Sequence, residues 1–150
     1  MWIDQRGSTV LERVECFRLV ALAARGHAIG RLAVSTEASP IVVPVNFGYR
    51  DACVLVRIGP GTLARIVPGR LVTLEVDAID EVAGEGWSVA VRGLARVLGA
   101  PDLERMGAAL PEPVVPTPGD LVLSIRGDVV TGRRFPVGNP STAVRVGPAG

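Results

Sequence analysis

One strand-and-turn segment carries residue types that bind anions. Residues 54–62 read Val-Leu-Val-Arg-Ile-Gly-Pro-Gly-Thr, so a branched strand leads to Arg57 and then to a glycine turn that ends at Thr62. Glycines such as Gly61 let backbone N–H groups point at one spot, while a guanidinium and a hydroxyl add hydrogen bonds. A short helix expected over residues 63–67 adds positive potential at its start. The segment therefore predicts a site for a phosphate group.

The same residues also have purely structural interpretations. An ion pair between Arg57 and a carboxylate, together with a tight turn over residues 59–61, explains the segment as well as a phosphate does. His27 is the only histidine, and we expect it in a surface loop. No nucleophile elbow accompanies it, which argues against a Ser-His-Asp hydrolase.

Two further charged groups have a functional and a structural reading. Glu75 and Asp77 lie two residues apart in a predicted strand, so they share one face, where arginines of the strand expected over 87–98 would pair with them. This salt pairing is favoured over a catalytic pair of carboxylates. Arg133 and Arg134 form either an exposed basic pair or a minor site for a second anion.

Composition narrows the class of protein. The formal charge is +1, from 16 basic and 15 acidic residues, so no bulk field favours nucleic acid or an anionic membrane as a partner. Every basic residue is arginine, which excludes lysine Schiff-base chemistry. Cys16 and Cys53 lack metal-site or redox spacing, so no metal is expected and both thiols are predicted to be reduced. No apolar run reads as a signal peptide or a membrane span, and the expected location is the cytoplasm.

The pattern of the chain predicts mainly β structure. Ser8 is a plausible cap for a helix over 9–24, and a second short helix is expected over 101–109, followed by a proline-rich crossing over 110–119. Strands are expected over 29–35, 41–47, 53–57, 71–79, 87–98, 121–126 and 129–135. The strand from Leu71 to Asp77 alternates, with Val72, Leu74 and Val76 on its dry face.

The connections between these strands are short, which favours antiparallel neighbours. An antiparallel sheet of about six or seven short strands often closes on itself, because closure hides its edges and leaves a single core. We therefore predict a small antiparallel β-barrel with flanking short helices. Residues 1–150 are expected to form a single domain, with a core over 8–135 and a loose tail over 136–150.

A collinear series of short motifs resembles one known family. The motifs are Glu15-Cys16-Phe17-Arg18-Leu19, Gly30-Arg31-Leu32-Ala33, Pro44-Val45-Asn46, Arg57 with Gly61-Thr62, Glu75-Val76-Asp77, Gly86-Trp87-Ser88-Val89 and Gly132-Arg133-Arg134-Phe135. Their order resembles the pyridoxamine 5'-phosphate oxidase-like family. That resemblance implies a flavin-binding split barrel, usually a homodimer, which holds FMN or a deazaflavin coenzyme in a groove between two subunits and acts on a small-molecule substrate.

The resemblance also assigns cofactor-binding residues. Arg57 and Thr62, with Gly61 in the turn, correspond to the positions that contact the cofactor phosphate. Backbone groups near Pro44, Val45 and Asn46 are expected along the ring system. Trp87 and Ser88 are expected to approach the same cleft, although a tryptophan at the start of a strand is ordinarily a packed anchor. No side chain is assigned as catalytic, because the cofactor ring carries the hydride.

The chain departs from the family at two positions of the phosphate segment. Relatives often have threonine directly after the strand arginine and lysine directly after the turn threonine, whereas this chain has Ile58 and Leu63. Loss of a charged contact weakens binding by roughly tenfold or more. Two functions therefore stay open: an FMN- or deazaflavin-dependent oxidoreductase, or a non-catalytic flavin- or haem-binding protein with a degenerate cofactor site.

Overall fold

The computed structural model describes residues 7–112 and 118–138, in which strands dominate. The helices are α1 (Arg13–Arg25), α2 (Thr62–Ile66), α3 (Ala100–Met106) and the 3-10 helix η1 (Gly107–Ala109). The strands are β1 (Thr9–Val10), β2 (Ile29–Val34), β3 (Ile41–Arg50), β4 (Cys53–Ile58), β5 (Leu71–Asp80), β6 (Glu85–Val97), β7 (Leu121–Arg126) and β8 (Val129–Pro136). The described part of the chain is thus mainly β, as its pattern predicts.

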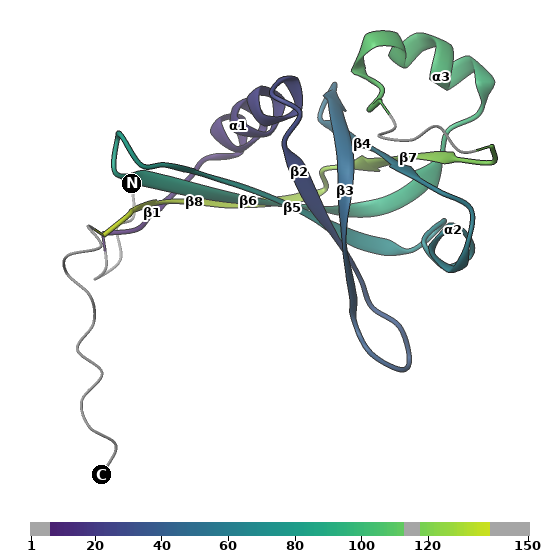
Figure 1. Cartoon of the computed structure of the whole chain (residues 1–150), viewed down its shortest axis with the longest axis horizontal. Coiled ribbons are helices and arrows are strands. Elements are labelled where there is room, and N and C mark those ends of the chain that lie inside the picture. Colours follow the sequence, from purple (N-terminus) through teal and green to yellow (C-terminus); the bar gives the residue numbers. More distant parts are fainter. Residues whose placement is uncertain (1–6, 113–117, 139–150) are drawn as a thin grey trace.

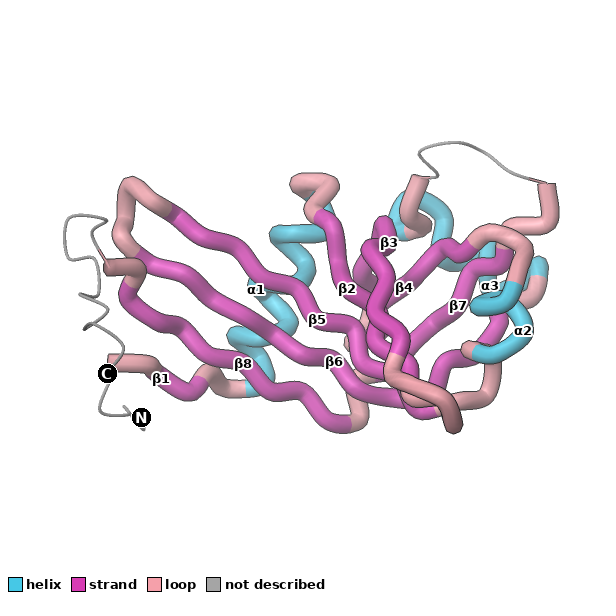
Figure 2. Tube along the Cα trace, turned by 60° about the horizontal axis from the view of Figure 1, so that its bottom comes forward, coloured by secondary structure: helices cyan, strands magenta, loops and turns pink. Residues whose placement is uncertain are grey.

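The strands form one antiparallel sheet that closes into a barrel. Their order is β1-β8-β6-β5-β2-β3-β4-β7, and an additional pairing joins β6 to β7. Closure is made by the end of β6, where Ala95 lies opposite Ile125 and Val97 opposite Leu123. Six strands therefore make the barrel, and β1, β8 and residues 85–92 of β6 extend from it as an outer arm (Figures 1 and 2).

The barrel core is built from alternating strand positions. Val72, Leu74 and Val76 of β5 are all buried, which confirms the predicted dry face of that strand. Helix α1 lies across one face of the sheet (Figure 1) and buries Cys16 and Val20 completely. Removing apolar side chains of this size from water stabilises the fold by about 1.5–3 kcal/mol each.

The start of α1 differs from the sequence prediction. The helix begins at Arg13 instead of residue 9, because Thr9 and Val10 pair with Arg134 and Arg133 of β8 as a short edge strand. Ser8 makes no cap for this helix; its hydroxyl accepts a hydrogen bond from Arg133 at 3.2 Å. Tertiary pairing has overridden the local helical pattern at these positions.

The second difference is the end of β3, because the strand predicted over 41–47 is longer in the structure. Strand β3 continues to Arg50, so the turn to β4 consists of Asp51 and Ala52, with φ values of 51° and 61°. The other strands start and end within two residues of their predicted bounds. Residues 139–150, most of the predicted tail, and Pro113 and Pro116 of the proline-rich crossing lie outside the described residues.

Candidate functional site

A cavity opens on the outside of the barrel beside β3. Its volume is about 1040 Å³, and its walls come from the C-terminal end of α1, from residues 46–51 of β3 and the following turn, and from residues 107–112 after α3. Arg57 of β4 and Asn46 of β3 both line it. Two residues predicted to bind the cofactor, 11 positions apart in the sequence, therefore meet at one cavity.

Arg57 is held by a backbone carbonyl. Its Nε donates to the Pro111 oxygen at 3.0 Å, and the side chain is half-buried. Among the described residues no carboxylate forms an ion pair with Arg57, and its two terminal nitrogens have no partner there. A guanidinium has five N–H donors, and the carbonyl uses only the one at Nε. Arg57 therefore keeps donors for an anion.

Asn46 makes a similar contact with the next backbone carbonyl after that of Pro111. Its Nδ2 donates to the Glu112 oxygen at 3.3 Å. Because Phe47 lies opposite Val56, Asn46 and Arg57 are neighbours on the same face of the β3–β4 pair. The cavity therefore combines a guanidinium and an amide with apolar walls from Ala24, Ala28 and Leu110.

The glycine turn lies beyond this cavity. Gly61 has φ of 147° with open space around it, and Thr62 is the exposed first residue of α2. Helix α2 has only five residues, so its dipole adds little at that point. Gly61 and Thr62 are within five residues of Arg57 in sequence but do not line the cavity.

The two departures from the family occupy different environments. Ile58 is only 5% exposed and belongs to the barrel core, so its side chain points away from any anion at the surface. Leu63 is half-buried at the second position of α2, where it packs against the core. The burial of Ile58 therefore argues against the interpretation that this position lacks a phosphate ligand.

The remaining predicted cofactor residues lie outside the cavity. On β3, Pro44 is exposed opposite Arg31 of β2, and Val45 is buried. On β6, Trp87 is half-buried against the core, and Ser88 donates to Glu75 at 3.0 Å. A monomer therefore brings only Arg57 and Asn46 of the predicted set together at this cavity.

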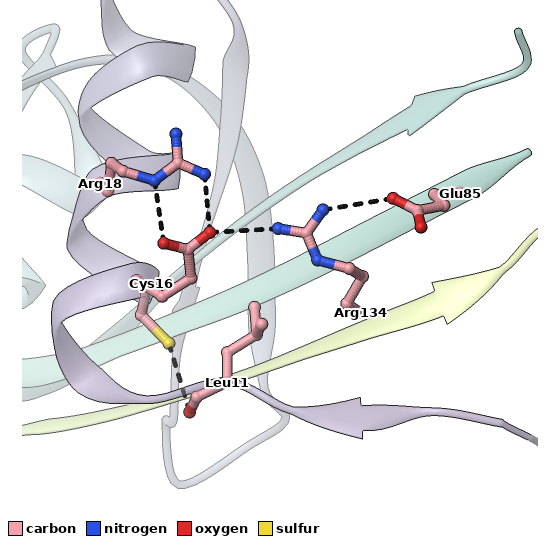
Figure 3. A network of polar contacts seen from close by, with 6 residues as sticks. Leu11, Cys16, Arg18, Glu85 and Arg134 are labelled. Carbon is pink, nitrogen blue, oxygen red and sulfur yellow. Dashed lines mark hydrogen bonds and ion pairs between the residues drawn. The ribbon is translucent and has the colours of Figure 1, made fainter. Parts of the chain in front are cut away.

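The charged pairs singled out in the sequence have structural partners. Arg31 of β2 lies 3.2 Å from Glu75 and 3.4 Å from Asp77, so the salt pairing is confirmed, but the arginine comes from β2 rather than from the expected β6. Arg134 bridges Glu15 at 3.1 Å and Glu85 at 3.3 Å, which ties α1 to the outer arm (Figure 3).

Glu15 and the cysteines titrate away from their usual values. The hydrogen bond from Arg18, aided by Arg134, lowers the pKa of Glu15. Burial raises the pKa of the Cys16 thiol, whose Sγ contacts the Leu11 carbonyl in Figure 3, and also that of Cys53. Both cysteines are free, and a raised pKa keeps them as unreactive thiols.

Other residues at the cavity were only partly anticipated. His27, exposed as predicted, has φ of 56° and lines the cavity. Arg50 also lines it and donates to the Arg105 and Met106 carbonyls at the end of α3. The sequence interpretation missed Arg50 and residues 107–112, because only tertiary packing lays that segment on β3; the run of prolines was the available signal of an ordered crossing.

The described part of the chain contains neither a metal-binding cluster nor a membrane-spanning helix. Within 7–112 and 118–138, no group of three His, Cys, Asp or Glu side chains is arranged to hold a metal ion. In the same ranges, no helix has the length and apolar character needed to cross a membrane. The cavity at Arg57 combines apolar walls with a few polar groups, as sites for organic ligands commonly do.

Comparison with known proteins places the chain in a family. Residues 12–134 match the model described as pyridoxamine 5'-phosphate oxidase. The uncharacterized protein Rv0080 of Mycobacterium tuberculosis is 32% identical over 131 residues, which cover 83% of this chain and 84% of that protein.

Solved structures agree with this placement. An FAD binding protein from Mycobacterium smegmatis is 31% identical, with a TM-score of 0.74 over 87% of this chain and 100% of that one. A putative pyridoxamine 5'-phosphate oxidase from Corynebacterium glutamicum shares the fold at 23% identity, with a TM-score of 0.71 over 92% of this chain and 100% of that one. The chain therefore belongs to the pyridoxamine 5'-phosphate oxidase family, whose fold is a flavin-binding split barrel.

Proposed function

We propose that this chain is a flavin- or deazaflavin-dependent oxidoreductase that acts on a small molecule. The observation that carries the proposal is Arg57, a half-buried guanidinium at a cavity; among the described residues its terminal nitrogens are unpartnered and it forms no ion pair, although Asp51 and Glu112 also line the cavity. Such a group is suited to a phosphate, and FMN carries a phosphate at the end of the ribityl chain that extends from its ring system. The similarity to a protein named as FAD-binding supports a flavin as the class of cofactor.

Different residues of this chain would bind different parts of such a cofactor. Arg57 would bind the phosphate, while Asn46 and the backbone near Pro44 and Val45 would lie along the rings. A bound flavin supplies the hydride transfer itself, so the protein contributes binding, orientation and exclusion of water. No general acid or base need be assigned to this chain.

A homodimer is the proposed assembly. On the outer face of the sheet, Leu71 lies opposite Leu94, and they are 65% and 49% exposed. Val42 shares that face, since it pairs with Ala33, which in turn pairs with Thr73, and it is 61% exposed. A second subunit that covered these residues would remove apolar surface from water and complete the groove around Gly61, Thr62, Trp87 and Ser88. The cytoplasmic location and the single domain stay predictions.

Arg57→Ala tests the assignment of the phosphate. FMN and riboflavin differ by one phosphate, so the variant should weaken FMN binding by about tenfold or more and leave riboflavin binding unchanged. Arg65→Ala is the matched control, because Arg65 is an exposed arginine of α2 that does not line the cavity. Fluorescence titration measures both dissociation constants, and light scattering on the same samples gives the oligomeric state. Equal losses of FMN and riboflavin would refute the assignment.

A non-catalytic binding protein is the second candidate, and Leu63 favours it. A leucine packed against the core stands where relatives often carry a phosphate-binding lysine. The absorption spectrum of gently purified protein separates flavin, haem and empty states, and mass spectrometry of the released molecule distinguishes FMN, FAD and a deazaflavin. Cofactor-dependent turnover of any small molecule would exclude this second candidate.

A further inference from the structure

We infer that the segment Gly107–Glu112, here called the strap, is a positioning element of the cofactor site: it holds Arg57 and Asn46 in place for a phosphate-bearing ligand, and Gly48 is the residue that seats it. The inference rests on the proposed function for its ligand. The contacts between the strap and the barrel carry it.

The strap follows one face of β3. Alternate residues of a strand share a face, and Asn46, Gly48 and Arg50 alternate. Arg50 donates to the carbonyls of Arg105 and Met106 just before the strap. Further along the same face, Gly48 meets the Ala109 backbone, and Asn46 donates to the Glu112 carbonyl. Three alternate positions of β3 thus contact three successive parts of the chain from Arg105 to Glu112.

Gly48 permits this close approach. A Cβ at this position would lie 1.8 Å from the Ala109 oxygen, a distance that no side chain tolerates. The contact is with backbone, which cannot swing aside as a flexible side chain does. Any substitution of Gly48 must therefore lift the strap from β3.

The strap leaves the binding capacity of the two side chains largely intact. Its carbonyls take one donor of Arg57, at Nε, and one donor of Asn46, at Nδ2. A neutral carbonyl does not cancel the charge of the guanidinium, whose terminal nitrogens stay unpartnered among the described residues. The contact therefore orders a long side chain without blocking it, and ordering before binding lowers the entropic cost of binding.

Gly48→Ala tests this role without altering either ligand-binding side chain. Losing the prior ordering of one or two side chains weakens binding by about two- to tenfold. We expect that loss for FMN and a smaller loss for riboflavin, which lacks the phosphate that Arg57 would bind but keeps the rings that Asn46 would contact. In an Arg57→Ala background, Gly48→Ala should weaken FMN binding only as much as it weakens riboflavin binding, because the arginine that the strap orders is already absent.

Gly93→Ala is the matched control. A Cβ there would lie 2.0 Å from the Arg126 oxygen, so the variant forces a similar backbone clash on the β6–β7 side of the barrel. It should lower stability comparably but leave the ratio of FMN to riboflavin affinities unchanged. If Gly48→Ala does not fold, Arg50→Ala replaces it, because the exposed Arg50 side chain anchors the segment ahead of the strap. Arg50 also lines the cavity, so the readout for this variant is the mobility of the Arg57 Nε, described next, rather than FMN affinity.

A second readout needs no flavin. Nitrogen-15 relaxation of the arginine Nε groups, with Arg57 assigned from Arg57→Lys, should show a rigid Nε in the unaltered protein and a mobile one in Gly48→Ala. If the unaltered protein binds neither a flavin nor a deazaflavin coenzyme, the proposed function fails and this readout alone decides on the strap. An Arg57 Nε that is equally mobile in both proteins, equal losses for FMN and riboflavin, or tighter FMN binding after Gly48→Ala would overturn the inference.

Discussion

Position 58 provides a direct test of how residues 54–62, the predicted phosphate-binding segment, are oriented. By comparison with relatives, Ile58→Thr would restore a phosphate ligand and strengthen flavin binding. In the structure Ile58 is 5% exposed, in the barrel core, where β4 pairs with Leu121 of β7. We therefore expect the variant to destabilise the protein without improving FMN binding.

The size of the effect follows from the groups exchanged. Ile58→Thr removes about two carbon groups from the core, at about 0.8 kcal/mol each, and buries a hydroxyl with no partner prepared for it, at about 1–3 kcal/mol. The sum is about 2.6–4.6 kcal/mol. For a chain of this length that corresponds to a Tm lower by roughly 5–18 °C.

Thermal unfolding followed by circular dichroism measures this change, and Ile58→Val is the control. Valine stays apolar and loses one methylene, so it should cost only about 1 kcal/mol.

Leu63→Lys should keep the fold and improve FMN binding, in contrast to Ile58→Thr. Leu63 is half-buried on α2, so a lysine can keep its stem against the core and place its ammonium in water near Thr62. That variant should strengthen FMN binding by about tenfold.

One result would refute this reasoning. If Ile58→Thr kept a Tm within about 2 °C of the unaltered protein and also bound FMN more tightly, position 58 would face the ligand, and the placement of β4 would have to be revised.

Two further predictions concern the contacts of α1 and the free thiols. Arg18 and Arg134 hold the pKa of Glu15 below its usual value, so the unfolded chain protonates this carboxylate first as the pH falls. The stability that Glu15 contributes at neutral pH is therefore lost below about pH 4.5. Glu15→Gln should flatten the decline of the urea unfolding midpoint in that range. Cys16 is fully buried and Cys53 is half-buried, and burial raises the pKa of both thiols. A thiol reagent near neutral pH should therefore leave Cys16 unmodified until denaturant is added. Rapid labelling of Cys16 in the folded Cys53→Ser variant would contradict its burial.

The strands could be predicted from the sequence because their signal is local. Val72, Leu74 and Val76 alternate with polar residues, and that period alone fixes which face of β5 is buried. The start of α1 could not be predicted in the same way. Thr9 and Val10 fit a helical pattern, yet their pairing with β8, more than 120 residues away in sequence, decides their conformation.

The candidate site was predictable in part for the same reason. Arg57 stands out because strand, glycine turn and charge are adjacent in the sequence. The contact of Arg57 with Pro111 joins residues 54 positions apart, and the role of Gly48 depends on the backbone of Ala109. Neither contact leaves a local pattern, since each arises only when α3 and the strap are laid on the barrel. The burial of Ile58 could not be predicted from the resemblance, because a resemblance aligns positions but does not state which way a side chain points.

Strand β6 has a mechanical consequence for the whole molecule. Its residues 85–94 pair with β5 along one edge, and on the other edge residues 85–92 pair with β8 and residues 95–97 with β7. Losing this one strand would open the barrel and detach the outer arm at once. We therefore expect the chain to melt in a single transition, with no stage in which the arm has come apart while the closed barrel survives.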